Sequence, residues 1–124
     1  MALKSTKFRI SSAARDILMA DTTVRALIGS RIFPCVAPED TDEDFILYYR
    51  DKYAVEQTKQ GIYMQTATVM FAVVSNGYER SQEIAEAIFI ALTESNTATR
   101  FELIDSTEDY SDKKYVQLLL FEIQ

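Results

Sequence analysis

Two long β-rich segments joined by a short polar turn constrain the fold of this chain more than any other feature. Residues 45–56, FILYYRDKYAVE, and 62–75, IYMQTATVMFAVVS, are rich in β-branched and aromatic side chains, and QTKQG lies between them. This pattern predicts a long hairpin, whose second strand would run roughly 45 Å at about 3.3 Å per residue. Because an ordinary strand has about 5 to 6 residues, a bulge that divides the second segment into two strands is an alternative.

The second strand of this hairpin has two halves of different character. Residues 69–74, VMFAVV, are apolar at every position, which is typical of a strand covered on both faces. The preceding residues 63–68 mix tyrosine, glutamine and threonine with apolar positions. We therefore expect the inner half to be a covered central strand of a sheet and the outer half to project beyond the core.

Two short helices are predicted before the hairpin. The first should begin near Ser11 or Ser12, because either side chain can cap a helix and apolar residues follow at helical spacing. Asp21 is placed to cap the second helix, and Gly29 is placed to end it.

A third helix is predicted after the hairpin. Asn76 and Glu79 have the spacing of a capping box. Phe89 and Ile90 fall at the flanks of the apolar stripe. Because the outer face of a helix on a sheet is normally polar, this helix has more apolar surface than contact with the sheet requires. The stripe itself consists of Ile84, Ala85, Ile88, Ala91 and Leu92.

Two strands close the chain, and together with the hairpin they define the fold class. One begins at Phe101, and the other, YVQLLLFEIQ, begins at Tyr115. Alternate residues of the last strand share one face, namely Tyr115, Gln117, Leu119, Phe121 and Ile123. The sequence predicts a single α+β domain over residues 1–124, with a mostly antiparallel sheet of about four strands and helices packed on one face.

Charge is distributed unevenly along the chain. Residues 1–31 carry six basic and two acidic residues, a sum of +4, and the remainder carries seven basic and seventeen acidic residues, a sum of −10. This acidic majority argues against nucleic acid as the main ligand. Either the asymmetry reflects solvated surfaces, or a basic face of one subunit meets an acidic face of another in a head-to-tail contact.

The residue types needed for catalysis are scarce. The chain has no histidine and three glycines, and no serine lies in a nucleophile elbow, so we expect neither an enzyme nor a cofactor. The acidic segments 39–44 and 106–112 are interpreted as solvated loops, with a Mg²⁺ or Ca²⁺ site and a metal-dependent hydrolase as the alternative.

Cys35, the single cysteine, is predicted to be a small buried hydrophobe. We expect a cytoplasmic protein without a membrane span.

The order of these features resembles a known family. The segment LIGSRIFPCVAP, the hairpin ending FAVVSNGYERSQEIAEAI and the closing YVQLLLFEIQ are similar to the tail-completion, or tail-terminator, proteins of long-tailed bacteriophages and prophages. The resemblance extends from about Ser12 to Ile123. Its most specific residues are Leu27, Gly29, Arg31, Ile32, Pro34, Ala37 and Pro38. The segment TDEDFILYY departs from the family because it is more acidic.

The resemblance implies a structural, non-enzymatic role in virion assembly. It implies a ring, typically a hexamer, on the head-proximal end of the tail tube, which ends tube growth and contacts the head connector. Another head-to-tail joining protein, such as a stopper or minor tail protein, is the alternative. The partners would be further copies of the chain, the major tail tube protein and the connector. Candidate interface residues are Arg15, Arg25, Arg31, Glu39, Asp40, Asp42, Glu43, Asp44, Tyr53, Lys59, Tyr63 and Phe89.

Overall fold

The computed structural model describes residues 7–39, 41–61, 63–95 and 99–123, and within them the chain forms three helices and a five-stranded sheet. The elements are α1 (Ile10–Ala20), α2 (Thr22–Ile28), β1 (Ile32–Pro34), β2 (Phe45–Gln57), β3 (Tyr63–Ser75), α3 (Tyr78–Thr93), β4 (Phe101–Ser111) and β5 (Lys114–Ile123). The strand order is β1-β2-β3-β5-β4, and all neighbours are antiparallel except β1 and β2. The predicted α+β class is confirmed, with the short edge strand β1 as the fifth strand.

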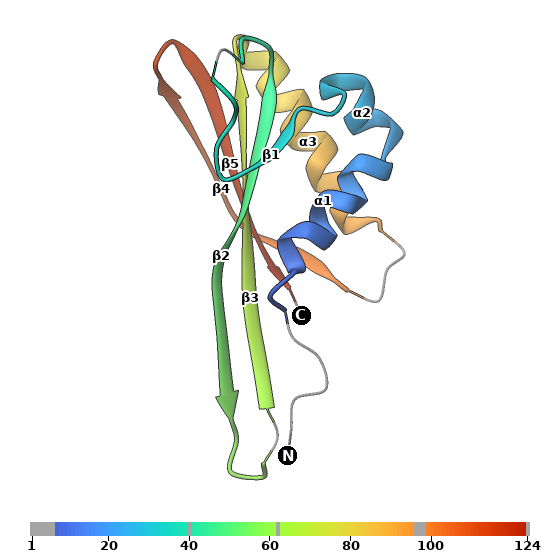
Figure 1. Ribbon diagram of the computed structural model, residues 1–124, viewed down its shortest axis with the longest axis vertical. Helices are drawn as coiled ribbons and strands as arrows, with labels where there is room; N and C mark the ends of the chain where they lie inside the picture. The colour runs from blue at the N-terminus through green and yellow to red at the C-terminus, as the bar shows by residue number, and fades with distance from the viewer. Residues whose placement is uncertain (1–6, 40, 62, 96–98, 124) are drawn as a thin grey trace.

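The long hairpin is confirmed as two continuous strands of 13 residues each. The alternative of a bulge that divides the second segment was wrong, and a register irregularity lies instead in β2, between Arg50 and Lys52, without interrupting either strand. Figure 1 shows the ends of β2 and β3 extending well past the helices as an arm. The turn sequence QTKQG therefore lies at the tip of a projection, as the mixed polarity of the outer half predicted.

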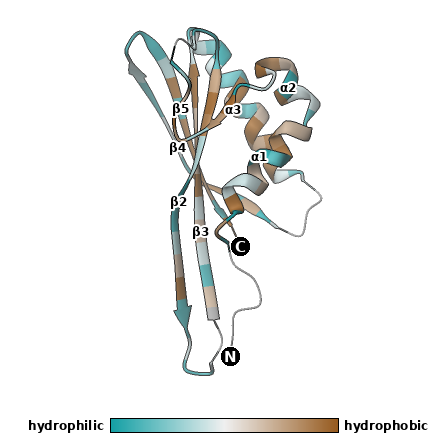
Figure 2. Ribbon diagram, in the orientation of Figure 1, coloured by the Kyte–Doolittle hydropathy of each residue, from teal (hydrophilic) through white to brown (hydrophobic). Residues whose placement is uncertain are grey.

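The core lies between the sheet and the helices, which all cover the same face of the sheet (Figure 1). Ile84 and Ile88 of α3 are fully buried in one cluster with Phe71 and Phe121 of the sheet. The Phe71 and Phe121 rings meet edge to face at 5.8 Å between centroids. Figure 2 shows hydrophobic residues gathered where the helices meet the sheet, while the outer half of β2 is mostly hydrophilic.

Local capping signals decide both ends of α2 but not the start of α1. The Asp21 side chain accepts a hydrogen bond of 2.9 Å from the Val24 amide, and Gly29 ends α2 with φ of 61°, so both predictions are confirmed. The helix α1 begins at Ile10, near the predicted position, but the predicted serine cap was wrong because no side chain caps it. Ser11 and Ser12 lie inside its first turn instead.

The start of α3 also differs from the prediction. The helix begins at Tyr78 after Gly77, and it has no side-chain cap. The Asn76 amide group instead donates a hydrogen bond of 3.1 Å to the Asp42 carbonyl, and its oxygen accepts one from Lys114. The Asn76 side chain therefore bonds to residues distant in the sequence and does not cap the helix as the capping box required.

Two further expectations were wrong. Cys35 is exposed, because it follows β1 in a tight turn with φ of 64° and faces away from the core. Residues 106–111 are not a loop but part of β4, where pairing with β5 holds a polar stretch in extended form. Asp112 and Lys113 make the turn that follows, both with positive φ, as tight hairpin turns require.

Candidate interaction surfaces

The acidic segment between β1 and β2 is fastened to the fold at one end of the molecule. Glu43 pairs with Arg31 at 2.8 Å, and the Arg31 Nε donates to the Asp44 carbonyl at 2.7 Å. The Asp44 carboxylate accepts a hydrogen bond from the backbone N–H of Asn76 at 3.3 Å and lies 3.5 Å from Arg80. These contacts join the chain before β2 to the start of α3. These contacts therefore fix the acidic segment to the rest of the fold, and the segment also presents a charged surface.

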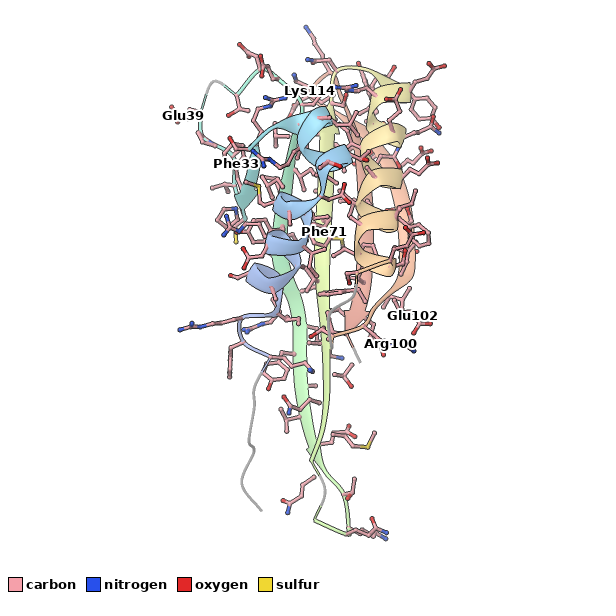
Figure 3. All side chains as sticks on the ribbon, turned by 90° about the vertical axis from the view of Figure 1, so that its right-hand side faces the viewer. Phe33, Glu39, Phe71, Arg100, Glu102 and Lys114 are labelled. Atoms are coloured by element: carbon pink, nitrogen blue, oxygen red, sulfur yellow. The ribbon has the colours of Figure 1, made fainter. Side chains whose placement is uncertain are left out.

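A lysine of β5 completes this attachment. Lys114, at the start of β5, donates to the Asp42 carbonyl at 3.3 Å. Figure 3 shows Glu39 and Lys114 at the same end of the molecule, with the hairpin arm at the other. The side chains of Glu39, Asp42 and Glu43 are exposed, whereas Asp40 lies outside the described residues. Among the described residues, no group of three or more His, Cys, Asp and Glu side chains could hold a metal ion.

A polar network beside this end joins α3, β4 and β5. The buried Gln117 amide donates to the Ser81 hydroxyl at 3.2 Å and to Glu108 at 2.6 Å. The Tyr78 hydroxyl donates to the other Glu108 oxygen at 3.1 Å. This hydrogen bond, with lesser effects of desolvation and the Glu108 charge, raises the pKa of Tyr78 above its usual value. The network anchors the exposed half of β4.

The hairpin arm is braced at its base by the segment before α1. The Phe8 and Tyr53 rings meet edge to face at 5.0 Å, and the Arg50 guanidinium lies over both. The Tyr53 hydroxyl donates to Gln65 and accepts from the Lys7 amide. The proposed interface residue Tyr53 is thus half-buried in intramolecular contacts.

The remaining candidate residues of the arm are at or near its tip. Lys59 is exposed in the turn, and the side chain of Tyr63 lies outside the described part of the chain. Val55 and Met64 are exposed apolar residues of the arm, at 42% and 58%. The arm therefore presents apolar as well as polar side chains beyond the subunit's own core.

The sheet face opposite the helices is a broad apolar surface, which we call the outer face. Three cross-strand rows form it: Phe45, Val74 and Val116; Phe33, Leu47, Ala72 and Leu118; and Tyr49, Met70 and Leu120. These residues are separate from the core cluster, and no described helix lies over them (Figure 1). The expectation that residues 69–74 are covered on both faces was therefore wrong for the subunit. Sequence reasoning missed this surface, although the apolar run at both strand faces was its signal.

The helix side of the molecule also carries exposed apolar groups. Phe89 and Ile90 of α3 are exposed at 40% and 43%, as predicted for the flanks of the stripe. Two adjoining hollows of about 370 and 380 Å³ lie beside α1, and both are lined by Ile17 and Ala20. Asp16 and Phe101 also line the first, and Asp21, Ile90 and Glu94 also line the second, so acidic side chains border both hollows.

Two of the three arginines listed as candidate interface residues belong to the helices. Arg25 is exposed in the last turn of α2, and Arg15 of α1 lies 3.0 Å from Asp16. Arg31, the third, pairs instead with Glu43 of the acidic segment. No helix in the described ranges is both long and apolar enough to cross a membrane.

Comparison with solved structures finds a similar chain in a structure titled "Virion of native gene transfer agent (GTA) particle". The TM-score is 0.76 at 18% sequence identity, and the match covers 92% of this chain and 92% of that chain. At this identity the likeness establishes a shared fold across nearly the whole length. Neither the protein-family models nor the curated proteins give a match.

Proposed function

We propose that this chain is a non-enzymatic structural protein of a phage-like virion, which caps the head-proximal end of the tail tube and joins it to the head connector. The observation that carries this proposal is the fold shared with a chain of a gene transfer agent virion over 92% of both chains. The resemblance in the segment around Arg31 to Pro38 favours the tail terminator among virion proteins.

The surfaces of the subunit suit assembly better than catalysis. Apolar groups outside the core cluster lie on an extended sheet face, a projecting arm and the flank of α3, and these surfaces are suited to flat protein contacts. Several copies would form a ring, with a hexamer expected, and the partners would be the tail tube protein and the connector. The subunits would be made in the bacterial cytoplasm and remain in the virion.

The acidic end of the subunit is suited to a position beside the channel through which DNA passes. Glu39, Asp42 and Glu43 present exposed carboxylates at one end of the molecule. If that end lines the channel of the ring, these carboxylates repel DNA phosphates and reduce sticking. A ring structure that places them on the outer rim would remove this assignment.

Deleting the gene from a strain that produces the particles tests the function. Loss of a tail terminator should give tails of excessive and variable length that lack heads, and expression of the intact chain from a plasmid should restore tail length. Tails of normal length that are detached from heads would instead identify a stopper or other joining protein. Normal particles in the deletion strain would contradict both roles.

A further inference from the structure

Two strands of the sheet are open along one side, and they lie at opposite ends of the strand order. Among the described strands, β4 pairs only with β5 and forms one edge. At the other edge, β1 pairs only with Ile46–Tyr48, so β2 is itself the edge strand from Tyr49 to Gln57. An open edge presents unpaired backbone groups and can lie against the edge of another chain.

Each open edge contains one register irregularity, at Asp51 in β2 and at Ile104 in β4. Irregularities of this kind limit continuous backbone pairing between edges. The side chains at the two edges therefore decide which edges can meet.

The β4 edge is acidic. Its sequence, FELIDSTEDYS, contains four acidic residues and no basic residue, and all four are exposed: Glu102, Asp105, Glu108 and Asp109. Two β4 edges brought together would place like charges side by side, which disfavours a symmetric contact between them.

The open stretch of β2 is basic by comparison. It carries Arg50 and Lys52, and the segment that contains Lys7 and Arg9 is held beside it, because the Arg50 guanidinium donates to the Phe8 carbonyl at 3.1 Å. Asp51 lies between the two basic residues of β2, but its carboxylate accepts a hydrogen bond of 3.4 Å from Thr68 of β3 and so points away from the edge. Opposite charges thus mark opposite edges of one sheet.

Cross-strand rows connect these two edges on the outer face. One row runs through Lys52, Thr68, Glu122 and Glu102, and a neighbouring row runs through Tyr49, Met70, Leu120 and Asp105. When the strands run along the axis of a ring, closure leaves no axial displacement, so each row meets the same row of the next copy. Three reversals of direction separate β2 from β4, so these strands of adjacent copies would be antiparallel.

The ends of the rows match chemically. Lys52 of one copy would lie beside Glu102 of the next, and the Tyr49 hydroxyl beside the Asp105 carboxylate. Arg100, which precedes β4, would come near Glu56, so the order of charges also matches along the edges. Figure 3 shows Arg100 and Glu102 at the level where the arm leaves the body of the subunit.

We propose that β4 of one copy of this chain lies beside the open stretch of β2 of the next copy, with Lys52 facing Glu102. The contact joins two different edges, so it repeats from copy to copy and generates a ring when the rotation closes. This proposal deepens the ring of the proposed function and rests on it. Its test uses the purified chain alone, whereas the capping function is decided by tail length in the deletion strain.

Disulfide cross-linking tests the contact. In a Cys35→Ser background, one chain carries both Lys52→Cys and Glu102→Cys and is oxidised mildly at high concentration and low salt. Three strand spacings of about 4.8 Å, or roughly 14 Å, separate these positions within a subunit, so a disulfide between them must join two copies. In the control chain, Glu86→Cys on the exposed side of α3 replaces Glu102→Cys.

The expected result is a ladder of cross-linked species that extends beyond the dimer and ends at the size of the ring, with a yield that falls as salt rises. A product that stops at the dimer would show a symmetric contact and overturn the proposal. Cross-linking no greater than in the control would overturn it as well.

Charge reversal provides a second readout without new cysteines. Lys52→Glu and Glu102→Lys should each weaken association, measured by sedimentation, roughly fivefold or more, because each places like charges side by side. Both reversals in one chain should restore most of the association, since opposite charges then face each other again. Lys59→Glu, exposed at the tip of the arm, is the matched control. Single variants that associate like this control, or a folded double variant as weak as the single ones, would contradict the proposed contact.

Discussion

Adjacent residues of α3 separate the core of the subunit from a surface that we expect to contact other proteins. Ile88 is 0% exposed and belongs to the core cluster, whereas Phe89 is 40% exposed and lies outside it. At about 0.8 kcal/mol for each buried carbon removed, plus the cavity left behind, Ile88→Ala should lower the free energy of unfolding by about 2–5 kcal/mol. Phe89→Ser should lower it by about 1 kcal/mol or less.

Thermal melts followed by circular dichroism measure this difference. An unfolding entropy of about 2 cal/mol/K per residue makes 1 kcal/mol equivalent to about 4 °C in a chain of 124 residues. Ile88→Ala should therefore lower Tm by roughly 8–20 °C, and Phe89→Ser by about 4 °C at most. Equal losses in the two variants would refute the reasoning, because the Phe89 ring would then contribute to the core as much as Ile88 does.

The Phe89→Ser variant also tests assembly. If Phe89 contacts another subunit or the tube, the folded Phe89→Ser protein should fail to restore normal tail length in the deletion strain. Restoration as complete as with the parent chain would show that Phe89 has no part in assembly.

Three further perturbations test other parts of the account. Asp44→Asn should lower the free energy of unfolding by about 1–2 kcal/mol in a denaturant titration, since it removes a partly buried ion pair and weakens a charge-assisted hydrogen bond; no change would mean that this attachment is dispensable. The double variant Arg15→Glu and Arg25→Glu should keep its circular dichroism spectrum and melt within about 0.5 kcal/mol of the parent, yet assemble poorly at low salt; assembly equal to the parent would exclude a role for these charges. Glu108→Gln should lower the pKa of Tyr78, read as the difference in tyrosinate absorbance between proteins with and without Tyr78→Phe; an unchanged pKa would mean that the Glu108 contact does not hold the proton.

Local chemistry made much of the fold predictable from sequence. Asp21 and Gly29 act through backbone groups within a few residues, so their positions alone identified the ends of α2. The hairpin was predictable because its side-chain types and turn lie in one continuous stretch. Cys35 was mispredicted because a lone free cysteine was treated as a small buried hydrophobe, whereas the turn after β1 leaves it exposed.

The candidate surfaces depend on contacts that sequence patterns do not contain. Asn76 and Lys114 reach the acidic segment from 34 and 72 residues away along the chain, so only the folded structure brings them together. The outer face was hidden for a related reason. An apolar run such as residues 69–74 shows that both strand faces need cover, but it does not say whether the cover comes from the same subunit or another.

Electron microscopy of tail tubes polymerised with and without this protein tests the central claim most directly. The account predicts that the protein forms a ring at one end of each tube, and that tubes do not lengthen from that end when more tube protein is added. Tubes that keep growing from both ends, with the protein absent from the ends or scattered along the sides, would contradict it.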